Sequence, residues 1–135
     1  MKTILKLSLI FITVLMISCD SKEKEKEIEK LKSETIAVHD EVMPKMDEIM
    51  KLKKSLRTEL DSVSNDESIN IKGLIMSLEN SDKAMMNWMR NYDPQMMDMS
   101  DEEKIEYLKK QKSAIQEVSA EMKSSISQAE DYLNR

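Results

Sequence analysis

The sequence predicts an all-α protein: an antiparallel up-down-up bundle of three helices, with a long kinked first helix, behind a signal peptide and a charged tether. The 135 residues include one glycine and two prolines, far fewer turn-forming residues than a β or a multi-loop α/β fold needs. Apolar residues recur at helical spacing over most of the chain. A formal charge of −5 disfavours nucleic acid as a partner, because phosphates would repel the chain.

Residues 1–18 have the pattern of a bacterial signal peptide. Lys2 and Lys6 supply positive charge, and the apolar stretch is shorter than the ~20 residues needed to cross a bilayer. It ends in the run LMISC at residues 15–19, which resembles the lipobox of bacterial lipoproteins. We therefore expect cleavage before Cys19, acylation at Cys19, and a membrane-anchored mature chain. With 19 basic and 26 acidic residues left, that chain has a charge of −7. The alternative is a free thiol that ends an ordinary signal sequence.

Residues 19–27 read as the lipid-anchored cysteine and a charged tether, and residues 28–135 hold the predicted bundle. The first helix has core positions every seven residues, at Ile28, Thr35, Val42, Ile49, Leu56 and Val63. Pro44 lies inside this run and has no amide hydrogen for the carbonyl of Asp40. It predicts a kink or, as the alternative, a division of the run into two helices.

Two capping motifs predict where the other helices begin. Residues 64–67 (SNDE) and 100–103 (SDEE) both fit the capping box, and Pro94 predicts the end of the second helix. The second apolar seam comprises Ile71, Leu74, Ile75, Leu78, Met85, Trp88, Met89 and Tyr92. The third comprises Ile105, Leu108, Ile115, Val118, Met122, Ile126, Ala129 and Leu133. Gly73 interrupts the second helix at a cost of about 1 kcal/mol relative to alanine, which a close helix approach would justify.

Methionine is concentrated near one end of the predicted bundle. Spacings of three and four residues place His39, Met43, Met46 and Met50 on one stripe of the first helix. Antiparallel folding about the turn near Ser64 returns a second group to this level, and the following connection adds a third. We expect nine thioether or imidazole side chains to converge beside Trp88: His39, Met43, Met46, Met85, Met86, Met89, Met96, Met97 and Met99.

This composition has four interpretations. Methionine fills irregular cores, which accounts for Met50, Met76, Met85 and Met122. Thioethers and an imidazole also suit Cu(I) or Ag(I), with Trp88 adding cation–π attraction. A haem held by His39 and a methionine is a third reading. A methionine-lined surface that binds a partner protein is the fourth, since such surfaces accommodate varied apolar ligands.

The segment HDEVMPKM at residues 39–46, followed by MMNWM at 85–89 and a tyrosine, is similar to a group of small Bacteroidetes lipoproteins. That group carries the name viral A-type inclusion protein, and no activity is assigned to it. The resemblance covers most of the mature chain and implies a helical bundle and a lipid anchor. It implies no functional residues.

The sequence favours a non-enzyme, because it has one histidine and lacks a phosphate-binding glycine loop, an HExxH motif and a nucleophile elbow. We expect a lipoprotein of the outer membrane, on its periplasmic face or at the cell surface, that has a structural or protein-binding role and no cofactor. The alternative is an extracytoplasmic Cu(I)/Ag(I) carrier or buffer. A homodimer is a further expectation, because the seam through Ile28 and Leu31 extends beyond what two helices would cover.

Overall fold

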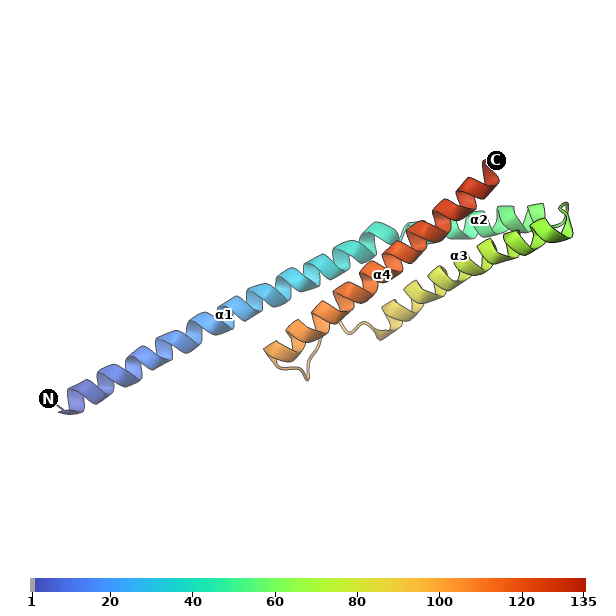
Figure 1. Cartoon of the computed structure of the whole chain (residues 1–135). Helices are drawn as coiled ribbons and strands as arrows, with labels where there is room; N and C mark the ends of the chain where they lie inside the picture. Colours follow the sequence, from blue (N-terminus) through green and yellow to red (C-terminus); the bar gives the residue numbers. More distant parts are fainter. Residues whose placement is uncertain (1) are drawn as a thin grey trace.

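The protein is an all-α bundle, as predicted (Figure 1). The computed structural model describes the backbone of residues 2–135 and the side chains from Ser21 onward. Its helices are α1 (Lys2–Val42), α2 (Lys45–Leu60), α3 (Asn65–Asn91) and α4 (Asp101–Leu133), and residues 2–135 contain no strand. The predicted signal peptide and the predicted acylation of Cys19 lie outside the described side chains. Within the described part, no helix is long and apolar enough to span a bilayer.

Pro44 interrupts the first arm of the bundle, which consists of α1 and α2. The amide of Met43 still bonds to the carbonyl of His39 at 2.8 Å, and Met46 then donates to the carbonyl of Met43 at 3.2 Å. Since proline has no amide hydrogen, the helical ladder is broken at this point. The two helices meet at an angle there (Figure 1), so the predicted kink takes the form of a two-residue turn between separate helices.

The core follows the predicted heptads with little departure. In the first arm, Thr35, Val42, Ile49 and Leu56 are fully buried, and their seven-residue spacing continues across Pro44. The fully buried positions of the other two helices are Ile71, Leu78, Met85, Leu108, Ile115, Met122 and Ala129. If the buried positions of the first arm are lettered a, the e positions of this repeat include His39, Met46, Lys53 and Leu60. Contacts of His39 and Lys53 with α3 show that this stripe faces α3.

The g positions of the first arm face α4 instead. Glu27, Glu34 and Glu41 pair with Lys109, Lys112 and Lys123 at 2.9, 2.8 and 2.6 Å. Residue numbers rise together along both helices, so α1 and α4 are parallel, as an up-down-up bundle requires. Lys24 continues the row by pairing with Glu102 at 2.7 Å. Residues 21–27 of the predicted tether are thus helical and paired with α4.

The two capping motifs differ in structure. At Ser100, the hydroxyl accepts from the amide of Glu103 while the Glu103 carboxylate accepts from the amide of Ser100, which completes the predicted box. Ser64 is the N-cap of α3, but its side chain makes no capping hydrogen bond. The motif at residues 64–67 therefore predicted where α3 begins but not the hydrogen bonds that define a capping box.

The apolar seam through Ile28 and Leu31 is covered by other parts of the same chain. Ile28 and Leu31 form a second core cluster with Met96 and Leu108. The expectation that this seam extends beyond the reach of the other helices is wrong, because α4 begins alongside it and the loop before α4 packs over it. This seam therefore gives no reason to expect a homodimer.

Candidate functional site

A row of four stacked rings links three helices at the level of His39. The His39 imidazole lies 5.6 Å from the Trp88 ring, Trp88 lies 4.8 Å from Tyr92, and Tyr92 lies 6.3 Å from Tyr107, all measured between centroids. The interplanar angles are between 20° and 29°. The expected proximity of His39 to the tryptophan segment is therefore confirmed.

Two polar atoms within this row lack partners among the described residues. The indole nitrogen of Trp88 and the hydroxyl of Tyr92 are both buried without a hydrogen bond. Burial, with smaller contributions from Tyr107 and Asp93, raises the pKa of the Tyr92 phenol. Tyr92 thus stays protonated at neutral pH. Tyr107 is engaged differently, because its hydroxyl oxygen accepts a 2.6 Å hydrogen bond from the amide of Asp93.

Three of the predicted site methionines belong to the main core cluster, which also includes Trp88. Met85 is fully buried, and Met46 and Met89 are half-buried against the same cluster. Met43 and Met86 are exposed on the surfaces of their helices. Side chains from both Met-bearing segments therefore contribute to the main core cluster.

The methionines of the second connection do not join this group. Met96 is buried in the second cluster with Ile28 and Leu31, and Met99 packs against that cluster. Met96 reaches this position with a φ of 47°, in the left-handed region. Met97 is 80% exposed. The convergence of nine side chains on one end is therefore wrong in its third part, because after α3 ends the loop runs beside residues 28–31 and not beside residue 39.

Core filling explains only part of the remaining methionines. Met85 and Met122 are fully buried, which confirms that interpretation for them. Met50 and Met76 are 56% and 60% exposed, so it is wrong for both. Met50 lies one residue after buried Ile49, in a b position that points away from the core, a signal that the heptad phase already contains.

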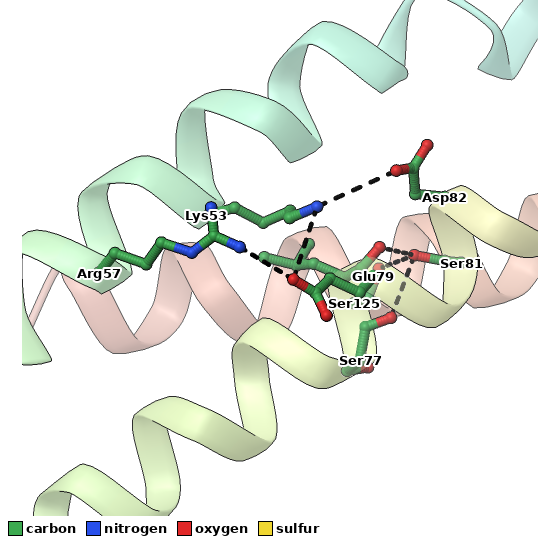
Figure 2. A network of polar contacts seen from close by, with 8 residues as sticks. Lys53, Arg57, Ser77, Glu79, Ser81, Asp82 and Ser125 are labelled. Carbon is green, nitrogen blue, oxygen red and sulfur yellow. Dashed lines mark hydrogen bonds and ion pairs between the residues drawn. The ribbon is translucent and has the colours of Figure 1, made fainter.

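A polar network that sequence reasoning did not identify lies between α2, α3 and α4 (Figure 2). Lys53 occupies an e position and is only 8% exposed, yet its ammonium is 3.8 Å from Glu79 and 4.0 Å from Asp82. Arg57 pairs with Glu79 at a closer 2.9 Å. Nearby, the buried hydroxyls of Ser81 and Ser125 are 2.9 Å apart. Small serines at these two core positions leave room for a polar layer in an otherwise apolar bundle.

Comparison with protein-family models, curated proteins and solved structures found no match. Among the described side chains, no three His, Cys, Asp or Glu residues are grouped in a way that could hold a metal ion.

Proposed function

We propose that this protein is a lipid-anchored, non-catalytic bundle of the bacterial outer membrane that binds a partner protein through the exposed Met50 of α2 and Met86 of α3. The observation that carries the proposal is the exposure of Met50 and Met86, which are 56% and 43% accessible beside the apolar core. Flexible thioethers on a surface adapt to varied apolar partners at little cost in strain.

The anchor rests on the lipobox-like run that ends at Cys19 and on the resemblance to small lipoproteins. Acyl chains contribute roughly 0.8 kcal/mol for each buried CH₂, so two or more hold a protein firmly at a membrane. Replacing Cys19 with alanine should move the protein out of the membrane fraction or stop its processing. An unchanged membrane fraction would contradict the anchor.

The partner is tested by photo-crosslinking in intact cells. A photoreactive residue is placed at Met50 or at Met86, and in a matched control at Met76, which is equally exposed on the outer surface of α3. We expect one discrete crosslinked species from the first two positions and none from the control. Equal crosslinking from all three positions, or none, would contradict a specific partner surface.

A second candidate function is extracytoplasmic binding of Cu(I) or Ag(I), favoured by one observation. His39 stacks on Trp88, and Trp88 belongs to the core cluster that also includes Met85 and Met89 of the same helix and Met46 of α2. Soft cations accept two or three thioether or imidazole ligands, and such ligands exchange readily. This chemistry suits a carrier or buffer.

A further inference from the structure

The polar network between α2 and α3 fixes how these antiparallel helices face one another. Lys53 faces Glu79 and Asp82, and Arg57 faces Glu79, at distances of 2.9 to 4.0 Å (Figure 2). These four residues come from two positions four apart on α2 and two positions three apart on α3. They form a quartet that spans the interface from its buried side at Lys53 to its exposed side at Arg57.

One heptad along the same interface, every member of this quartet is replaced by methionine. Met46 and Met50 lie seven residues before Lys53 and Arg57, and Met86 and Met89 lie seven residues after Glu79 and Asp82. In antiparallel helices, a shift of seven residues back on one and seven forward on the other preserves the facing positions. All four methionines lie within uninterrupted α2 and α3. Four methionines therefore occupy facing register positions on α2 and α3, and we call them the methionine quartet.

Burial supports this equivalence. Met46 and Met89 are half-buried against the main core, whereas Met50 and Met86 are exposed. The same gradient runs through the polar quartet from buried Lys53 to exposed Arg57. Two half-buried and two exposed methionines thus occupy these facing positions, so the set is accessible to solvent on one side.

We propose that the methionine quartet is a binding site for Cu(I) or Ag(I), which names the ligands of the second candidate function and rests on it. Thioethers are soft neutral donors that prefer these cations to Zn²⁺, Mg²⁺ or Ca²⁺. Two to four of them can serve, and the flexible Met side chain can bring its sulfur to the metal without moving the backbone. The quartet includes Met50, which occupies an exposed b position outside the core, and does not include Met96, Met97 or Met99.

Thioether ligation also predicts how binding depends on pH. A thioether has no proton to lose, whereas an imidazole must be neutral to bind a metal. Affinity at the quartet should therefore change little between about pH 5 and 7.5, a range in which ligation through an imidazole generally weakens on acidification. The pH profile separates the quartet from the ring row.

The test uses the full chain purified in detergent, with Cu(I) supplied from a chromophoric chelator under reducing, oxygen-free conditions. The test variant is Met46→Leu with Met50→Leu, and the matched control is Met76→Leu with Met97→Leu, because leucine nearly conserves the volume of methionine. A third variant replaces Met96 and Met99 with leucine. Thermal melts followed by circular dichroism verify that all variants remain folded.

We expect the test variant to lose about tenfold or more in Cu(I) affinity, while the control and the loop variant retain that of the unmodified chain. Ag(I), which shares the ligand preference, should change the emission of Trp88, the sole tryptophan, which adjoins Met89 in the sequence. If the unmodified chain holds no Cu(I), the second candidate function fails together with the quartet. If it binds Cu(I) and the test variant binds equally well, or if acidification weakens binding as an imidazole would, the quartet alone is wrong.

Discussion

The imidazole of His39 stacks on the indole of Trp88 with 5.6 Å between centroids and 29° between planes. This contact joins α1 to α3, although α1 packs chiefly against α4. It lies five residues before Pro44, where the first arm changes direction. The ring pair therefore holds the end of α3 against the arm beside its kink.

A double-mutant cycle should reveal this coupling. Stacked aromatic pairs contribute about 0.5–1.5 kcal/mol beyond the area they bury, so His39→Ala and Trp88→Leu should be non-additive by that amount. Trp88→Leu alone should cost more than His39→Ala, because Trp88 is 8% exposed within the core. The free energy of unfolding comes from urea titrations at neutral pH. His39→Ala paired with Leu56→Ala, about 25 Å further along the arm, is the additive control. Equal coupling in both cycles would contradict a direct interaction.

Replacing Gly73 with alanine should stabilise the protein by about 0.5–1 kcal/mol. Gly73 lies in α3, and a Cβ built there meets no other atom within 4 Å. The close helix approach that would justify glycine is therefore not found, and only the gain in helix propensity remains. Urea unfolding of Gly73→Ala against the unmodified chain measures the difference. A loss of stability would show that Gly73 has a role beyond the described contacts.

The sequence predicted the architecture well because the same heptad positions that define the pattern also define burial. Val42, Ile49 and Leu56 are fully buried on both sides of Pro44, and the turn at residues 43–44 leaves their phase unchanged. The capping motif at Ser64 shows a structural detail that the local sequence pattern does not determine. Its residues mark the start of α3, but whether the hydroxyl accepts a bond depends on a side-chain rotamer that spacing does not determine.

The candidate site was predictable where it follows helical register and not where it depends on a loop. Folding about the turn near Ser64 correctly placed Trp88 opposite His39. The path of residues 92–100 depends on backbone angles such as the positive φ of Met96, which no periodicity encodes. The burial of Lys53 was also not predicted, because a charged residue at an e position is expected to be exposed when the position of the neighbouring helix is not known.

Replacing Lys53 with methionine should leave stability unchanged or raise it by up to about 1 kcal/mol. Lys53 lies in a nearly closed site, and its distances of 3.8 and 4.0 Å to the two carboxylates give weak compensation for desolvation of the ammonium. Glu79 would retain Arg57, and Asp82 keeps contact with solvent. Lys53→Met also reproduces the residue found one heptad earlier, Met46.

The measurement for Lys53 is again the free energy of unfolding in urea. Lys54→Met, at an exposed position of the same helix, is the matched control and should change stability little. Lys53→Glu should destabilise clearly, since it places a third carboxylate beside Glu79 and Asp82. A loss of more than about 1 kcal/mol in Lys53→Met would mean that the long ion pairs stabilise the bundle on balance.

Acid should weaken the contact between α1 and α4. Hydrogen bonds from Lys112, Lys123 and Lys24 hold the pKa values of Glu34, Glu41 and Glu102 below their usual value of 4.5. A carboxyl whose pKa is lower in the folded state binds protons first in the unfolded state as the pH falls. The contribution of such a carboxyl to the stability of the fold is complete above its pKa in the unfolded state. This contribution disappears as the pH falls through its pKa in the folded state. Stability should therefore be nearly flat from pH 7 to about 5.5 and decline below about 4.5.

Thermal melts from pH 7 to 3 at low salt measure this decline. The double variant Glu34→Gln with Glu41→Gln should melt lower than the unmodified chain at pH 7 and show a shallower loss on acidification, because it has fewer paired carboxylates to protonate. Glu29→Gln, an exposed change on the same helix, should leave the slope unaltered. High salt should reduce the difference between the double variant and the unmodified chain, since both pairs are accessible to solvent and therefore screened. If the melting temperature of the double variant fell with pH as steeply as that of the unmodified chain, the acid-sensitive groups would lie elsewhere. The contact between α1 and α4 would then depend on its apolar residues.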